Sequence, residues 1–340
     1  MSGPDRDTQR RLEHLVGDAP VDPDARLGAV HAGAARMRAR RRTATVTLAT
    51  AVPLVVVLGI FLALRGAGTP EVPEYRVLVA GGPSLQLVDT DAWRARGLAT
   101  GMRAYAPTLS PDGGTVIYAA GEVSEGTALW SMPVPAGPST SPEPVRISSP
   151  RNATAPRFSP DGTTIAFVQD TDDRPGIWTM RPDGTGQRQL TGGPGVVDAH
   201  PAWSPDGDRI AFERIQGDRA TLLSMAPDGT DVRRVADIGA RDQVSPNGVT
   251  WSPDGTTIVY SDGDDLWRVP ATGGTAERLT DGPERDWTPS FSPEGSQIAF
   301  LRWGEGIRTL SLAEPDESRL VVPSHSTGDD VLFTSVEWGS

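Results

Sequence analysis

Histidines and clustered carboxylates are the residue types of this sequence that most often bind metals or move protons in proteins. The chain has 340 residues, with four histidines and no cysteine. His200 lies in the stretch DAHPAWSPDG and His325 in PSHSTGDD, in separate loops. Two histidines so placed form no recognisable ligand set, and the lack of cysteine excludes thiolate ligands and disulfides. We therefore predict no metal ion and no cofactor.

Two aspartate-rich loops offer the oxygen ligands that calcium prefers. They are QDTDDR at 169–174 and SDGDDLW at 261–267. Neither has the ordered aspartate spacing of a calcium loop, so both are interpreted as solvated loops. The sequence also lacks the Gly-x-Ser-x-Gly pentapeptide that presents a hydrolase nucleophile. We predict no catalytic residues and a protein that is not an enzyme, with a hydrolase or lyase as an alternative hypothesis.

A repeated turn marks the strands that would position any functional site. Ser-Pro-Asp-Gly, or Ser-Pro-Glu-Gly in the last copy, occurs five times at spacings of 49, 45, 48 and 40 residues. This order suits a type I turn followed by a left-handed glycine, which closes a β-hairpin. A period of about 40–50 residues is typical of a propeller or another repeat array. The turn residues are Ser110, Pro111, Asp112, Gly113, Ser159, Pro160, Asp161, Gly162, Ser204, Pro205, Asp206, Gly207, Ser252, Pro253, Asp254, Gly255, Ser292, Pro293, Glu294 and Gly295.

Each turn belongs to a unit of four short strands. An aromatic-ended strand precedes the turn, and a β-favouring run such as Ile-Ala-Phe follows it. A third strand such as GIWTM at 176–180 and a polar fourth strand such as RQLT at 188–191 complete the unit. Four antiparallel strands form one blade, and blades bury their faces by stacking around an axis. A β-sandwich with unrelated turns is the alternative, which the fivefold recurrence of the same order disfavours.

The repeated pattern PxWSPDGxxIAF…IWxMxxDG…LT resembles the WD40-like (PD40) repeat of the TolB family. The resemblance covers about residues 75–340. It implies an all-β propeller fold, and it implies little about function because propellers carry many activities.

Incomplete copies of the repeat at the two ends of the propeller region predict a sixth blade. Residues 335–340, SVEWGS, place Trp338 where Trp203 and Trp251 end a first strand. Residues 75–100 supply three more strands, expected at 75–80, 84–88 and about 95–100. This 3+1 ring closure would remove the open sheet edges that invite aggregation. The extra SPNG at 245–248 is interpreted as an insertion in a loop.

The segment before the propeller predicts a membrane anchor. Residues 43–64 form an uncharged run that is long enough for one transmembrane helix. Several arginines lie just before this run. The positive-inside rule then places a tail at 1–42 in the cytoplasm, a stalk at 65–74, and the propeller at 75–340 outside a bacterial cell membrane. A cleaved signal peptide is the alternative, but its apolar region is usually about 7–15 residues.

The charge distribution narrows the class of partner. The formal net charge is −12, and the region after the tail is acidic. Nucleic-acid binding requires basic patches, so we predict no nucleic-acid partner. A protein or envelope-associated ligand is expected instead.

Strand direction separates two faces of the ring. The Ser-Pro-Asp-Gly turns share one face, the turn face, and the loops between second and third strands and between blades share the other, the loop face. Variable loops usually carry binding sites, so we expect His200, Arg285, Trp287 and Trp303 on a binding face there. The leading hypothesis is a non-catalytic, extracytoplasmic binding or sensing module. The alternative is a signalling regulator, similar to membrane anti-sigma proteins, whose tail binds a cytoplasmic partner.

Overall fold

The described part of the chain is all-β. In the computed structural model the chain divides into two units, Met1–Thr69 and Pro70–Ser340, and every described residue lies in the second. Among these residues no helix has the length and apolar character needed to cross a membrane. The predicted tail at 1–42, transmembrane helix at 43–64 and stalk at 65–74 lie outside the described residues. The structure describes residues 76–81, 84–89, 94–99, 102, 104–121, 126–134, 142–149, 151–170, 175–240, 248–313, 318–323 and 335–339.

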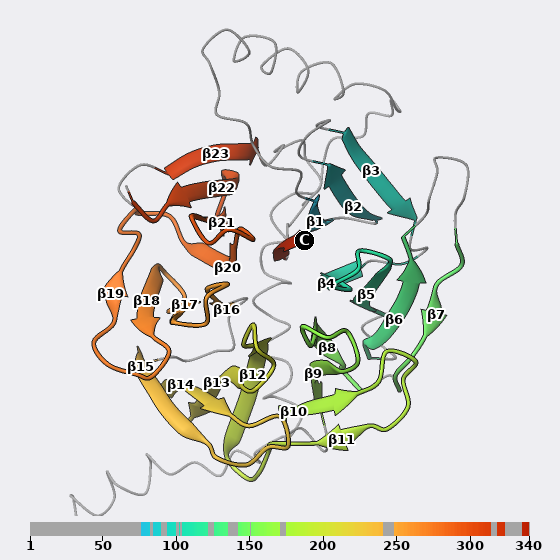
Figure 1. The fold of residues 1–340 in the computed structure, drawn as a ribbon, viewed down its shortest axis with the longest axis horizontal. Helices are drawn as coiled ribbons and strands as arrows, with labels where there is room; N and C mark the ends of the chain where they lie inside the picture. Colours follow the sequence, from blue (N-terminus) through green and yellow to red (C-terminus); the bar gives the residue numbers. More distant parts are fainter. Residues whose placement is uncertain are drawn as a thin grey trace, which may run out of the picture. The chain divides into compact units, whose positions relative to one another are not determined.

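The strands pair into six antiparallel sheets of four strands each. Five sheets consist of consecutive strands and are called blades one to five (Figure 1). Blade one comprises β4 (Ala104–Leu109), β5 (Thr115–Ala120), β6 (Ala128–Pro133) and β7 (Val145–Arg146). Blade two comprises β8 (Thr154–Phe158), β9 (Ile165–Asp170), β10 (Pro175–Met180) and β11 (Arg188–Gln189). Blade three comprises β12 (Val196–Trp203), β13 (Ile210–Gln216), β14 (Arg219–Met225) and β15 (Arg233–Ala240). Blade four comprises β16 (Val249–Trp251), β17 (Thr257–Ser261), β18 (Leu266–Pro270) and β19 (Glu277–Arg278). Blade five comprises β20 (Asp286–Phe291), β21 (Gln297–Arg302), β22 (Gly306–Ser311) and β23 (Ser318–Pro323).

The remaining sheet, called the closing sheet, joins the two ends of the propeller region. Its strand order is β24 (Ser335–Gly339), β1 (Arg76–Gly81), β2 (Ser84–Asp89) and β3 (Arg94–Ala99). The backbone thus pairs three N-terminal strands with one C-terminal strand, the arrangement expected from the two incomplete copies. The predicted bounds of all three N-terminal strands were wrong by one residue, at both ends of β1 and β3 and at the last residue of β2, because strand ends are poorly encoded by local sequence. Arg76 pairs with Gly339, so the chain enters this unit beside the point where it leaves.

The sheets stand around a central axis, with the first strand of each blade innermost (Figure 1). Contacts run from β4 to β8, β12, β16, β20, β24 and back to β4. Hydrophobic clusters of described residues fill five of the spaces between neighbouring sheets, from the closing sheet and blade one round to blades four and five, because alternate residues of a second strand point to opposite faces. Leu85 of β2, for example, is buried with Val116 and Tyr118 of blade one.

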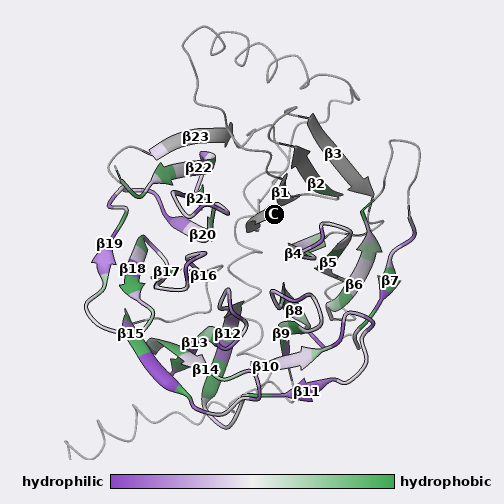
Figure 2. Ribbon diagram, viewed as in Figure 1, coloured by the Kyte–Doolittle hydropathy of each residue, from purple (hydrophilic) through white to green (hydrophobic). Residues whose placement is uncertain are grey.

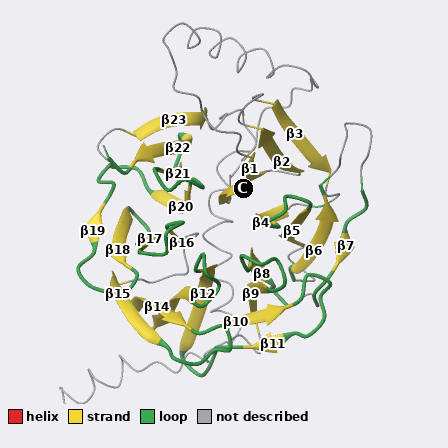
Figure 3. Cartoon of the chain, in the orientation of Figure 1, coloured by secondary structure: helices red, strands yellow, loops and turns green. Residues whose placement is uncertain are grey.

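Polarity increases from the axis outwards. The second strand β9 is buried almost throughout, whereas the outermost strands β11 and β19 are exposed and hydrophilic (Figure 2). Strands and connecting loops make up the whole described region (Figure 3). This gradient is what a stack of four-stranded blades requires, since each blade covers the faces of its neighbours and leaves its outermost strand in water.

A bulge bends the innermost strand of four blades. Ala106, Ala155, His200 and Thr288 have φ between 42° and 54°, each precedes a proline, and the strand register shifts at each of them. Left-handed backbone costs about 1–2 kcal/mol for a non-glycine residue, so the neighbouring packing must hold these bulges in place. In blade four Gly248 stands at the same position, where a Cβ would lie 2.9 Å from Thr288 Cα. The residue there is glycine because the bulge of blade five leaves no room for a side chain.

Candidate functional site

The repeated serine and aspartate are used within each turn. Ser159 Oγ donates to Asp161 Oδ1 over 2.5 Å and accepts from the amide of Thr164 over 3.0 Å, and Gly162 N donates to Ser159 O. Ser110, Ser204 and Ser252 repeat this arrangement. The serine hydroxyl, more than any other group, holds the pKa of Asp161 below its usual value, and the same is true of Asp112, Asp206 and Asp254.

The proline and glycine connect one turn to the next. A Cβ on Gly162 would lie 3.5 Å from Pro111 Cδ, and one on Gly295 would lie 3.2 Å from Pro253 Cδ. Gly207 meets Pro160, and Gly255 meets Pro205, in the same way. The turns therefore form a collar around the axis. The collar borders a cavity of about 380 Å³ whose lining includes Trp203, Trp251 and Arg157.

The loop face carries a cluster of three of the four residues expected to bind a partner. Arg285 precedes β20, Trp287 lies on β20, and Trp303 follows β21. The rings of Trp287 and Trp303 lie 5.3 Å apart between centroids, and Trp303 N donates to Arg285 O over 2.8 Å. The sequence could not show this convergence, because it depends on the register of β20 against β21, which shifts at a bulge. We call Arg285, Trp287, Trp303 and Asp264 the loop-face patch.

The members of the patch differ in exposure. Trp303 is 51% exposed, whereas Trp287 is 9% exposed and its Nε1 donates to Gly263 O over 3.1 Å. Arg285 is an exposed partner of Asp264, with Nε and Oδ1 3.1 Å apart. Trp287 therefore acts as the packed base of the patch, and Trp303 and Arg285 are the groups that a partner can reach.

His200 is not where the sequence predicted it. It lies within β12, at the bulge, and not in a loop before the strand. Its Nδ1 is 3.2 Å from Oε2 of the buried Glu213. His200 and the loop-face patch belong to different blades, so the structure brings together three of the four predicted binding residues. The bulge escaped prediction because a residue before proline is normally extended.

Buried ion pairs beneath the loops were missed by sequence reasoning. Asp286 and Arg302 are cross-strand partners in blade five, and Asp198 and Arg214 hold the same positions in blade three. Each arginine makes two hydrogen bonds of 2.7–2.8 Å to a fully buried aspartate. Hydrogen bonding to these aspartates raises the pKa of both arginines. Alignment of the repeats could have found these pairs, because the aspartate and the arginine stand at the same separations in sequence from the turn serine in both blades.

The aspartates of the 261–267 loop have protein partners. Asp262 accepts from the amides of Asp264 and Asp265 and from Trp267 Nε1, and Asp265 pairs with Arg278 over 2.5 Å. Residues 171–174 of the other acidic loop, and His325, lie outside the described residues. Within the described ranges no three His, Asp or Glu side chains are grouped as a metal site would require.

Comparison with known proteins identifies the family. A family model described as the TolB β-propeller domain (PD40) matches residues 139–324, more than half of the chain. The chain therefore belongs to the TolB β-propeller family. An uncharacterised protein of Agrobacterium fabrum, Atu1656, is 32% identical over 65 residues, which are 18% of this chain. The chain spans 22% of the length of that curated relative.

Solved structures share the fold. TolB from Acinetobacter baumannii is 21% identical, with a TM-score of 0.62 over 84% of this chain and 71% of that one. The nidogen/laminin complex contains a chain that is 16% identical, with a TM-score of 0.63 over 78% of this chain and 98% of that one. At these identities the similarity establishes the propeller fold alone.

Proposed function

We propose that this protein is a non-catalytic binding module that recognises a protein or an envelope-associated ligand through the loop-face patch. The observation that carries the proposal is the exposed Trp303, whose ring lies in tilted contact with the packed Trp287 next to Arg285. Tryptophan and arginine are the residues most enriched where binding energy concentrates in protein interfaces. The described aromatic side chains are otherwise more buried than Trp303, so its exposure is not the rule in this fold.

The setting of the patch supports the same function. Asp286 N donates to Asp264 O over 2.9 Å, and Ser261 Oγ donates to Asp286 O over 2.8 Å, so the end of β17 and the loop after it in blade four are held against the start of β20 in blade five. A preorganised surface loses less conformational freedom when a partner binds. Membership of the TolB family is consistent with a protein-binding role.

The finer features of the proposal come from the sequence. We take the ring to be a closed six-bladed propeller, anchored in a bacterial cell membrane by a single helix at 43–64, with the tail at 1–42 in the cytoplasm. The uncharged run and the arginines before it support this topology. Labelling intact cells with a membrane-impermeant amine reagent at a single lysine introduced at Gly217 should modify the protein, whereas a lysine introduced at Thr8 should stay unmodified. The reverse pattern would contradict the topology.

Matched variants test the binding face. Tagged full-length protein should recover envelope partners after cross-linking, and Trp303→Ala or Arg285→Glu should reduce that recovery by about tenfold or more. Arg181→Glu is the control, because Arg181 is an exposed arginine beside a turn on the opposite face. Equal losses from Arg285→Glu and Arg181→Glu would rule out the loop face as the site.

A further inference from the structure

The cavity inside the turn collar has one charged side chain, Arg157, among the described residues that line it. The rest of this lining comes from all five blades and consists of apolar residues, serines and one threonine. Phe158 and Trp203 are half-buried there, and four collar prolines are exposed, Pro111, Pro160, Pro205 and Pro253. Ligand pockets commonly have volumes of about 300–1,000 Å³, an apolar lining and a few polar groups. With its volume of about 380 Å³, the cavity fits a small ligand.

Arg157 is a departure from the repeat. It stands two residues before the turn serine, where the other four blades have small residues, Thr108, Ala202, Thr250 and Ser290. Trp203 Nε1 of blade three donates to the carbonyl of Arg157 over 3.2 Å, so the backbone that carries the guanidinium is held in place. Positions where a sequence departs from its own pattern are those where a functional constraint is expected.

Arg157 also differs from the other half-buried arginines of the described chain. Five of these pair with a carboxylate: Arg209 with Asp231, Arg214 with Asp198, Arg268 with Glu277, Arg302 with Asp286, and Arg308 with Glu305. Arg157 has no carboxylate partner among the described residues, and its guanidinium makes one hydrogen bond to them, from Nη1 to the carbonyl of Pro156 over 2.9 Å. Since a guanidinium has five N–H donors, most of those of Arg157 are available to a ligand.

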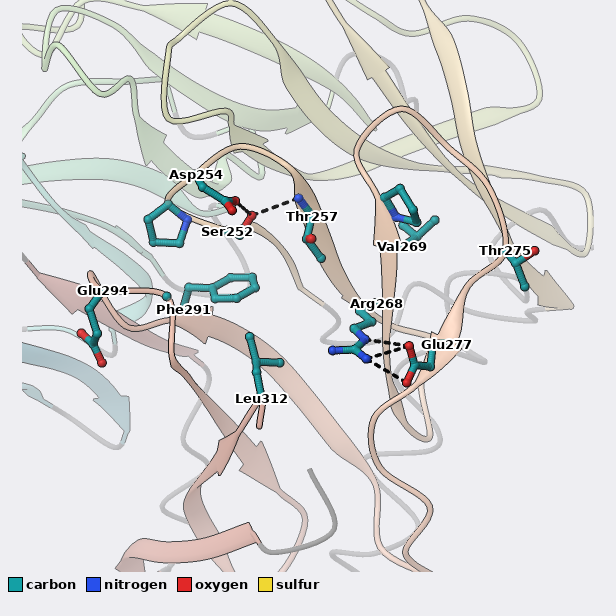
Figure 4. A pocket seen from close by; sticks show the side chains of 13 residues that line it. Ser252, Asp254, Thr257, Arg268, Val269, Thr275, Glu277, Phe291, Glu294 and Leu312 are labelled. Carbon is teal, nitrogen blue, oxygen red and sulfur yellow. Dashed lines mark hydrogen bonds and ion pairs between the residues drawn. The ribbon is translucent and has the colours of Figure 1, made fainter. Parts of the chain in front are cut away.

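The aspartates of the first four turns are engaged within their own turns. Asp254 accepts from the hydroxyl of Ser252, which in turn accepts from the amide of Thr257 (Figure 4). In all four turns the serine hydroxyl lowers the pKa of the aspartate most, and Arg157 contributes to none of these shifts. None of the four aspartates lines the cavity. The charge of Arg157 therefore stays available inside the collar.

We propose that this cavity binds a small organic acid that carries one carboxylate on a compact apolar body. The carboxylate pairs with the guanidinium of Arg157, whose planar fork matches two carboxylate oxygens. The apolar body lies against Phe158, Trp203 and the prolines of the collar. The exposed turn aspartates around the opening disfavour a ligand with two or more negative charges, because repulsion grows with each added charge. The site lies on the turn face, so the inference does not depend on the proposed function of the loop-face patch.

Calorimetric titration of the full-length protein with phenylacetate tests the inference. Phenylacetate should bind one site saturably, with a Kd of about millimolar or tighter. Phenylacetamide, which has the same shape without the charge, and the dianion phenylmalonate should each bind about tenfold more weakly or less. Equal affinity for phenylacetate and phenylacetamide, or no binding of phenylacetate, would overturn the proposal. Tighter binding of acetyl-Ala-Ala-Phe with a free carboxylate would overturn the assignment to a small molecule in favour of the end of a protein chain.

Variants of Arg157 locate the binding. Arg157→Thr gives blade two the residue that blades one and four have at this position, so it should keep the melting temperature and weaken phenylacetate binding by about tenfold or more. Arg157→Lys keeps a cation without the planar fork and should retain part of the affinity. Arg151→Thr is the matched control, since Arg151 is an exposed arginine just before the same strand and outside the cavity. Unchanged affinity in Arg157→Thr, or an equal loss in Arg151→Thr, would overturn the proposal.

Discussion

Asp286 and Arg302 face each other across β20 and β21, joined by two hydrogen bonds of 2.8 Å, with the arginine carbon Cζ 5.6 Å from the centre of the Phe300 ring. The carboxylate is fully buried and the guanidinium is nearly so. Asp286 stands between Arg285 and Trp287 in the sequence, at the start of β20. It therefore connects the buried interior of blade five to the proposed binding surface.

Removal of one partner of this pair should be costly. Arg302→Leu leaves a buried carboxylate without its cation, and we expect a loss of about 3 kcal/mol in the free energy of unfolding. Asp286→Leu with Arg302→Leu should recover most of that loss, because no buried charge remains. Urea unfolding of the two variants measures both values. A double variant as unstable as the single one would show that packing, and not the unpaired charge, sets the cost.

Substitution of each tryptophan in the loop-face patch should separate effects on stability from effects on binding. Trp287→Ala removes a buried ring and a hydrogen bond to Gly263, and should cost about 3–5 kcal/mol. Trp303→Ala removes a half-exposed ring and should change the free energy of unfolding by less than about 1 kcal/mol. Thermal and urea unfolding of both proteins provide the measurement. A large destabilisation by Trp303→Ala would indicate that its role is packing.

Glycines at two turns should respond differently to substitution. Gly184 has φ of 86°, and an added Cβ would overlap the carbonyl of Ile147, whereas Gly217 has φ of 64° with nothing within 4 Å. Gly184→Ala combines backbone strain with a clash and should cost about 3 kcal/mol or more. Gly217→Ala carries the strain alone, about 1 kcal/mol. Similar unfolding midpoints for the two variants would contradict the close packing of successive blades.

The turn aspartates should make stability depend on acid pH. The folded-state pKa of Asp161 is lowered, so its contribution is present above the ordinary pKa near 3.8 and is lost as pH falls through the folded value. Ser159→Ala removes the hydroxyl that lowers this pKa most. Its destabilisation should therefore be larger at pH 7 than at pH 3, as measured by urea unfolding.

An Asp161→Asn background provides the control for that experiment. With no carboxylate left to titrate, the cost of Ser159→Ala should be the same at both pH values. A pH dependence that survives in this background would assign the effect to another group.

The sequence alone determined the repeating unit of this protein. The Ser-Pro-Asp-Gly turn and the strands on either side of it could be predicted, because turn chemistry and strand alternation act over about ten residues. The pairing of the chain ends could be predicted from the repeat itself, because the incomplete copies at the two ends together make up one more unit. The acidic composition predicts a partner other than a nucleic acid, because negative charge repels the phosphates of nucleic acids. Trp303 and Arg285 could be selected as candidates by residue type and loop position.

The tertiary structure decided which of these residues meet. Trp287 is packed and Trp303 is exposed because a bulge in β20 sets their register. His200 lies in a strand because the same kind of bulge bends β12. Pro253 and Gly295 meet because blade four stacks on blade five. Such contacts join residues that are distant in sequence, or depend on a one-residue shift in strand register. Local sequence patterns encode neither.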